Sequence, residues 1–180
     1  ELRRDLAVIA ALQLAALGYG VHTVFEARPV FTVFAVDRFE VVTANEIEPE
    51  LLAKAKRPEF STLSMAGPAL VAADTPDDAK ERGRLIFAAS EGVDVKHFPE
   101  YYAPYAERSA QALRRAKPLS NLIEKRPETK WRIEEFLDSS KRQQQETGFL
   151  PLSARTQDFC VLLDRKDGKV VGFLSVDPWI

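Results

Sequence analysis

Residues 6–25 form a run of twenty residues without a single charge, and this run restricts the fold more than any other feature of the chain. Charged residues flank it on both sides, and the remainder of the chain carries charges, Pro and Gly at ordinary density. At a rise of 1.5 Å per residue, a helix of this length covers about 30 Å, the thickness of the hydrocarbon layer of a bilayer. The run therefore predicts one transmembrane helix within residues 1–28, followed by one domain at residues 29–180.

A buried helix of a soluble protein and a signal peptide are the two other interpretations of this run. Polar side chains such as Gln13 and Thr23, together with the many Ala residues, favour a buried soluble helix. Such a helix usually turns one polar stripe to water, however, and no charge occurs here. A signal peptide has a shorter apolar region, of about 7–15 residues. The spanning helix explains the whole pattern best.

The charges next to the predicted helix indicate its orientation. Arg3 and Arg4 precede it, whereas only Arg28, offset by Glu26, follows it. Since positive charge favours the cytoplasmic side, the N-terminus should lie inside and the domain outside. In a Gram-negative bacterium this orientation places the helix in the lipid of the inner membrane and residues 29–180 in the periplasm.

Small residues recur along the predicted helix at a spacing of four. Ala7, Ala11 and Ala15 form one row, and Ala16 and Gly20 form another. In lipid, such a spacing lets helix backbones approach one another closely. We therefore expect these five residues to contact other membrane helices.

Bulk properties limit what the domain can be. Residues 29–180 amount to about 150 residues, enough for one domain with its own core. The formal net charge of −2 argues against a nucleic-acid partner, which requires a basic face. Cys160 is the only cysteine in the sequence, so an intramolecular disulfide is excluded.

Four β-rich runs predict the strands of the domain. Residues 30–42 alternate as one long strand, and residues 68–73 form a second, between a Gly and the start of a helix. Near the C-terminus, residues 158–164 and 169–177 are joined by a turn that contains Asp-Gly, a pair that supplies the positive φ of a hairpin turn. These two runs predict a C-terminal β-hairpin.

Helical patterns separate the first two strands from this hairpin. A short helix is expected around residues 49–56, a second at 75–91, a third along the aromatic stripe at 102–113 and a fourth at 128–145. The order of elements predicts an α+β domain. Its sheet should be mainly antiparallel with about four strands, and the helices should pack on one face.

The strand at residues 30–42 contains a charge where the pattern asks for an apolar residue. Asp37 falls on the apolar face, so it must be re-aimed by a bulge, paired or used for binding, whereas Arg38 points to the polar face and could reach a partner's carboxylate. Tyrosines are favoured anchors at protein interfaces. The alternative is a structural ion pair and a tyrosine core. The predicted partner-binding residues are Asp37, Arg38, Phe39, Tyr101, Tyr102 and Tyr105.

Catalysis has little support in the sequence. Cys160 and His97 could be named as nucleophile and base, but Cys160 lies in an apolar strand and His97 in a loop. No phosphate loop, GxSxG or lysine-based motif occurs, and two histidines, one of them in the apolar run, make no credible metal site. We expect neither an enzyme nor a cofactor.

Two segments resemble a known family. The segment RPVFTVFAVDRFEVVTANEI at residues 28–47, directly after an Ala/Leu-rich helix, resembles the signature region of the type IV pilin accessory proteins of the TfpX/TfpZ kind. The closing residues 150–179, LPLSARTQDFCVLLDRKDGKVVGFLSVDPW, resemble that family's terminal hairpin and its Pro-Trp ending. The resemblance implies an inner-membrane protein with further spans before residue 1. It also implies that the protein assists a type IV pilin subunit, by stabilising it or by modulating pilus assembly, and it brings no catalytic residues.

Three classes of function are therefore compared. The first is a membrane-anchored accessory protein or chaperone that binds a type IV pilin subunit. The second is an extracytoplasmic sensor domain for a small ligand, which would need a cytoplasmic output module. The third is an unrecognised hydrolase built on Cys160. The resemblance favours the first class.

Overall fold

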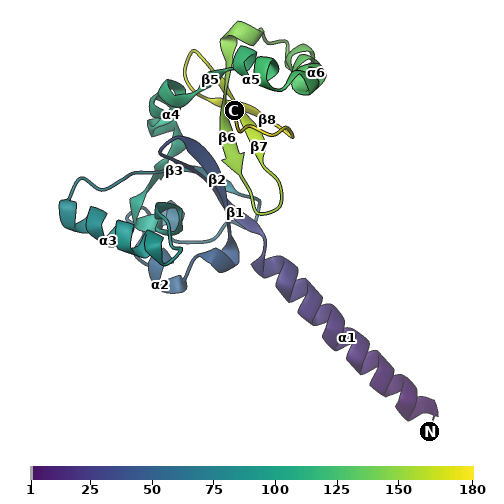
Figure 1. Ribbon diagram of the computed structural model, residues 1–180. Helices are drawn as coiled ribbons and strands as arrows, with labels where there is room; N and C mark the ends of the chain where they lie inside the picture. Colours follow the sequence, from purple (N-terminus) through teal and green to yellow (C-terminus); the bar gives the residue numbers. More distant parts are fainter. Residues whose placement is uncertain (1) are drawn as a thin grey trace.

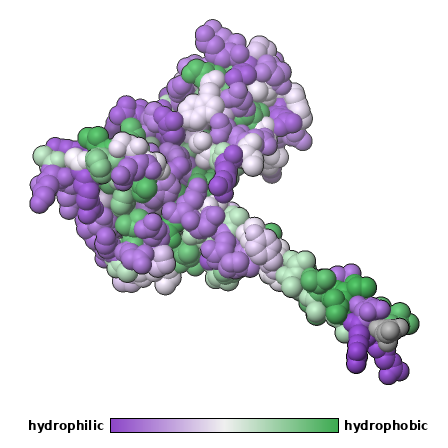
Figure 2. All heavy atoms as spheres, turned by 60° about the horizontal axis from the view of Figure 1, so that its bottom comes forward, coloured by the Kyte–Doolittle hydropathy of each residue, from purple (hydrophilic) through white to green (hydrophobic). Residues whose placement is uncertain are grey.

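A computed structural model describes residues 2–180 and shows a long helix projecting from a folded domain (Figure 1). This helix, α1, spans Leu2–Glu26, and none of its residues is buried. It is long and apolar enough to cross a membrane, the one such helix among residues 2–180. Figure 2 shows its hydrophobic flank beside a mainly hydrophilic domain surface. The prediction of a helix over residues 6–25 is therefore confirmed, with bounds a few residues wider on the N-terminal side.

A short segment joins α1 to the domain, and contacts of Arg28 hold it on both sides. The guanidinium of Arg28 lies 3.9 Å from the centre of the Phe25 ring, and its Nη1 donates to the Phe25 carbonyl at 2.8 Å. The Arg28 carbonyl in turn accepts the backbone N–H of Ala44 at 3.0 Å. The first strand begins at Pro29, so the helix runs almost directly into the sheet.

One mixed sheet runs through the whole domain. Its main order is β4-β3-β1-β2-β6-β7-β8, and β5 pairs with β6 off this path. Two contacts are parallel, β1 with β3 and β2 with β6, and the others are antiparallel. The strands are β1 Pro29–Ala35, β2 Arg38–Thr43, β3 Ala69–Ala73, β4 Tyr102–Pro104, β5 Lys117–Pro118, β6 Thr147–Ser153, β7 Phe159–Asp164 and β8 Val170–Leu174. The α+β class is confirmed, but the expected sheet of about four mainly antiparallel strands is wrong.

The predicted single strand at residues 30–42 is a hairpin, made of β1 and β2. At its tip Val36 has a φ of 58°, and the N–H of Asp37 donates to the carbonyl of Ala35 at 2.7 Å. This is a three-residue turn centred on Val36. The apolar alternation did not reveal it, because a β-branched residue stands where a turn usually has Gly or Asn.

The helices differ from their predicted bounds. They are α2 Pro49–Leu52, α3 Ala79–Ser90, α4 Ser109–Arg115, α5 Leu119–Lys125 and α6 Lys130–Ser140, and several single turns of 3-10 helix lie between them. The helix expected at residues 102–113 is wrong in its first half, because Tyr102 and Ala103 pair with β3 instead. The helix expected to continue to residue 145 ends at Ser140, and the next residue, Lys141, has a left-handed φ of 54°. α5 lies in a segment where no helix was expected.

Helices cover both faces of β6 and β7, so the expectation of helices on one face is wrong. On one face, α5 and α6 contribute Leu122 and Ile133 to a cluster with Leu162 of β7. On the other, α4 contributes Ala112 to a cluster with Val161 of the same strand. Successive residues of β7 thus belong to two different cores, which buries the strand on both sides.

The C-terminal hairpin is confirmed. β7 pairs with β8 in antiparallel register, and Gly168 in the connecting turn has a φ of 73°. A Cβ atom at Gly168 would lie 2.3 Å from the carbonyl oxygen of Ser109 at the start of α4. Glycine is therefore needed here for both its backbone conformation and its lack of a side chain.

Candidate interaction surface

The tip of the β1–β2 hairpin and the C-terminal tail meet on the surface of the domain. The guanidinium carbon of Arg38 lies 5.1 Å from the centre of the Trp179 ring, and the indole N–H of Trp179 donates to Asp158 Oδ2 at 2.6 Å. These segments are far apart in the sequence, but β2 and β6 pair in parallel through Phe39 and Leu152. We call Asp37, Arg38, Asp158 and Trp179 the Arg38–Trp179 surface. It joins the two segments on which the family resemblance rests.

The charges on this surface stay accessible. Arg38 Nε lies 2.9 Å from Asp37 Oδ1, with side-chain exposures of 41% and 51%. The hydrogen bond to Asp37 is the main cause of a raised pKa of Arg38, so the guanidinium is charged at every physiological pH. Trp179 is itself 39% exposed. Asp37 is thus a turn residue paired with its neighbour, and it does not lie on an apolar sheet face as the pattern had predicted.

Ion pairs and hydrogen bonds hold the tail that carries Trp179. Arg126 Nη2 pairs with the carboxylate of Asp177, and Lys117 Nζ donates to the carbonyl of Ile180 at 3.0 Å. The backbone N–H of Trp179 donates to Asp177 Oδ1 at 3.0 Å. The indole ring is therefore placed by several contacts along the tail. A sequence pattern could not show the stack with Arg38, because it depends on the pairing of β2 with β6.

The predicted aromatic residues of the site lie inside the domain. Tyr105 donates its hydroxyl to the Gly168 carbonyl at 2.6 Å, Tyr102 donates to the Lys96 carbonyl, and Tyr101 accepts from Arg84 at 2.9 Å. Burial raises the pKa of all three phenols. Phe39, Tyr101, Tyr102 and Tyr105 are at most 6% exposed, so in this structure their rings have no surface to offer a partner. The binding prediction stays a prediction for all six residues, of which Asp37 and Arg38 are the accessible ones.

Cys160 and His97, which the sequence offered only as an unsupported nucleophile and base, lie in different parts of the domain. Cys160 is fully buried in the core beneath α5 and α6, and burial raises its pKa to about 12, far from a reactive thiolate. His97 lies in a 3-10 turn, where its Nδ1 accepts the N–H of Asp94 at 3.0 Å, and burial lowers its pKa. The structure also shows no group of three or more His, Cys, Asp or Glu side chains within residues 2–180 that could hold a metal.

One hollow of the domain lies beside His97, between α2, α3 and the segment that follows α3. Two of its charged groups already have partners. Glu46 accepts from the backbone N–H of Thr43 at 2.7 Å, and Lys96 pairs with Glu40. Ligand sites usually present free polar groups that converge on one point. This hollow therefore gives the small-ligand sensor no specific support.

The protein is thus an α+β protein with a helix that is long and apolar enough for a membrane, and it carries the exposed Arg38–Trp179 surface. The chain is similar to two fimbrial assembly proteins of Dichelobacter nodosus, of serogroups I and E1. Each is 29% identical over 163 residues, which cover 89% of this chain and 63% of the relative. The chain thus spans less than two thirds of the length of these relatives. No family model matches the sequence, and no solved structure matches it. The similarity supports the expected relation to type IV pilus proteins, and the TfpX/TfpZ kind stays a prediction.

Proposed function

We propose that this chain belongs to a membrane-anchored accessory protein, or chaperone, that binds a type IV pilin subunit and supports its stability or pilus assembly. The similarity to fimbrial assembly proteins over 89% of the chain carries this proposal. The apolar helix α1, in which no residue is buried, supports a membrane anchor. In this proposal residues 1–28 cross the inner membrane and residues 29–180 form the periplasmic domain.

The Arg38–Trp179 surface supports a binding function. Arg and Trp are enriched among the residues that dominate the binding energy of protein interfaces. Here they are stacked, half-exposed and flanked by the carboxylates of Asp37 and Asp158. A partner's carboxylate could replace Asp37 on the guanidinium, since the exposed pair contributes no more than about 1 kcal/mol.

The test is co-purification from membranes in mild detergent with the full-length protein. We expect a pilin subunit in the eluate of the wild type and its loss with Arg38→Ala. Arg132→Ala is the matched control, because Arg132 also lies over an exposed tryptophan, Trp131, at 5.0 Å. If the Arg38→Ala protein still co-purifies with pilin, the Arg38–Trp179 surface is not the binding site. If the wild-type protein co-purifies with no pilin, the proposed function is wrong.

The orientation is tested separately by reporter fusions at Ile180. Alkaline phosphatase folds only outside the cytoplasm, so a fusion at Ile180 should be active and a cytoplasmic reporter at the same position silent. The opposite pattern would contradict the periplasmic position of the domain. It would also remove the proposed access to pilin.

A further inference from the structure

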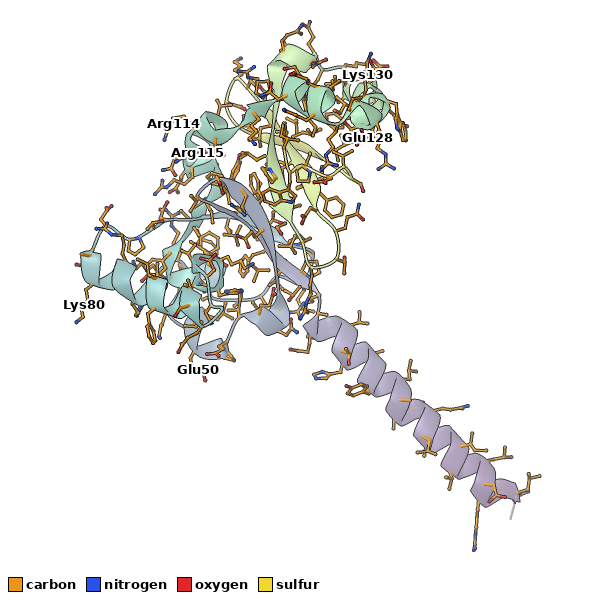
Figure 3. All side chains as sticks on the ribbon, in the orientation of Figure 1. Glu50, Lys80, Arg114, Arg115, Glu128 and Lys130 are labelled. Atoms are coloured by element: carbon orange, nitrogen blue, oxygen red, sulfur yellow. The ribbon has the colours of Figure 1, made fainter. Side chains whose placement is uncertain are left out.

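A groove on the domain lies at the tip of the β1–β2 hairpin, on the side that faces α4. It is lined by Val36 of the β1–β2 turn, by the residues at the end of β3 as far as Asp74, and by Arg108, Arg114 and Arg115 of and next to α4. We call it the α4 groove. Figure 3 labels Arg114 and Arg115 on α4, beside the end of the hairpin.

Two of the arginines in the α4 groove have no internal partner. Arg108 is satisfied, because its Nε and Nη2 each lie 2.7 Å from a carboxylate oxygen of Asp74. Arg114 and Arg115 are exposed and make no ion pair with any residue from 2 to 180. Asp77 adds one further carboxylate to the lining. The groove is therefore net positive in a chain whose net charge is −2.

The same groove offers an apolar contact. Val36 is 65% exposed, and next to it lie the buried side chains of Phe34 and Ala72. A valine with a φ of 58° is unfavourable, because the β-branched side chain crowds the backbone in this region. Strained backbone of this kind clusters at active sites, ligand clamps and switch regions. The groove thus combines one exposed aliphatic side chain with two free guanidinium groups.

We infer that the α4 groove binds an acidic peptide segment of a protein partner, with an apolar side chain of that segment against Val36 and its carboxylates on Arg114 and Arg115. This inference rests on the proposed function for the identity of the partner, a pilin subunit, and adds the chemistry of the segment that is recognised. Guanidinium groups bind carboxylates in paired, charge-assisted hydrogen bonds, which suit this arrangement.

The position of the groove favours a protein over a lipid surface. β1 begins three residues after α1 and carries the chain away from the helix end over seven residues, a distance of about 20 Å. Val36 follows at the far end of this strand. Anionic headgroups around α1 would therefore lie near the opposite end of β1. At physiological salt, charges interact over about 8 Å, which is shorter than this strand.

The test uses the full chain in detergent and a fluorescein-labelled acidic peptide, Glu-Glu-Asp-Leu-Glu-Asp, in a fluorescence anisotropy titration. Because Arg114→Glu with Arg115→Glu replaces two guanidinium contacts by like charges, this double variant should weaken binding at least about tenfold. The control pair Lys80→Glu with Lys166→Glu makes the same charge change on exposed residues outside the groove. It should leave the affinity within about twofold, because distant surface charges are screened.

A second variant tests the apolar contact without disturbing the turn. Val36→Asn keeps a residue that tolerates the left-handed backbone and removes the aliphatic side chain. It should weaken binding of the Leu peptide but leave unchanged the binding of a peptide with Ser in place of Leu. Equal loss for both peptides would contradict the contact at Val36.

Several outcomes overturn the inference. They are no binding by the wild type, equal binding by the Arg114→Glu/Arg115→Glu variant, and displacement of the peptide by phosphatidylglycerol added to the detergent micelles, which would assign the groove to lipid. The peptide titration is independent of pilin. If the wild type binds the peptide but brings no pilin from membranes, the proposed function fails and the groove stands; if pilin co-purifies equally with the double variant, the groove fails and the function stands.

Discussion

Two apolar segments of this chain have opposite surroundings. In β7, residues 160–163 are fully buried, with alternate side chains in two separate cores. In α1, residues of similar hydrophobicity are more than half exposed, among them Leu12, Leu14 and Leu17. Burial of a leucine contributes about 1.5–3 kcal/mol, which the domain supplies to β7 but not to α1. The comparison shows that α1 adds no buried side chain to the cores of the domain, so its apolar surface stays uncovered.

The largest expected effect is that of a charge placed in β7. Leu162→Arg puts an unpaired guanidinium at a position with no solvent exposure, and the cost of several kcal/mol should prevent the domain from folding. Near-ultraviolet circular dichroism and limited proteolysis of the full chain in detergent measure this loss. A protease-resistant Leu162→Arg protein would show that the two cores are far more adaptable than close packing allows.

The same change in α1 should weaken insertion of the helix into the membrane and leave the stability of the domain unchanged. Leu14→Arg is expected to disfavour insertion by about 2.5–3.5 kcal/mol, seen as release from membranes on carbonate extraction. Thermal unfolding of the domain should stay as in the wild type, because Leu14 is 67% exposed in the structure. A lowered melting temperature would break the comparison, since it would mean that α1 packs against the domain.

Substitution of one glycine in each region tests the same comparison with a smaller expected change in stability. Gly168→Ala should lose about 1–3 kcal/mol, because φ is positive there and the new Cβ would overlap the Ser109 carbonyl. Gly20→Ala should leave the domain unchanged, since nothing lies within 4 Å of a Cβ at Gly20. Urea unfolding followed by fluorescence measures both. If Gly20→Ala alters only the association of the protein in membranes, the proposed helix contact through Ala16 and Gly20 gains support.

The smallest effect concerns the two histidines. Burial lowers the pKa of His97 in the folded domain. As the pH falls through about 6.5, His97 is therefore protonated in the unfolded chain before it is protonated in the folded domain. The free energy of unfolding decreases as a result. His97→Gln keeps an acceptor for the Asp94 N–H and should flatten this decline between pH 7.5 and pH 5.5. His22→Gln is the control in α1. Melting curves at several pH values test the difference, and equal slopes for His97→Gln and the wild type would assign the decline to other groups.

The sequence predicted those elements whose local chemistry is sufficient to define them. The β7–β8 hairpin followed from its Asp-Gly turn, and α1 followed from its uncharged length. The turn between β1 and β2 was missed because Val36 is a strand-forming residue. β6 was not predicted, and it contains Pro151, a residue that argues against a strand. In the structure Pro151 falls between the residues that pair with β5 and those that pair with β2, so its missing N–H is tolerated.

The candidate surface was predictable only in part. The pattern identified Arg38 as an exposed cation, but its partner Trp179 was noted only as part of a family ending, since the contact depends on long-range strand pairing. The tyrosine stripe had the spacing of a helix, and hydrogen bonding to β3 overrode that preference at Tyr102. Arg114 and Arg115 drew no attention, because a pair of exposed arginines on a helix is common and only the hollow beside them suggests a use.

The joint at Arg28 sets the direction in which α1 leaves the sheet. The Phe25 ring, the Phe25 carbonyl and the Ala44 N–H all contact Arg28, so this residue ties the end of the helix to the β1–β2 hairpin. With these contacts kept, a rotation of the helix about its own axis turns the α4 groove in the same sense. We therefore expect two copies whose helices pack along the row of Ala7, Ala11 and Ala15 to present their grooves at a relative angle that depends on that packing in the bilayer.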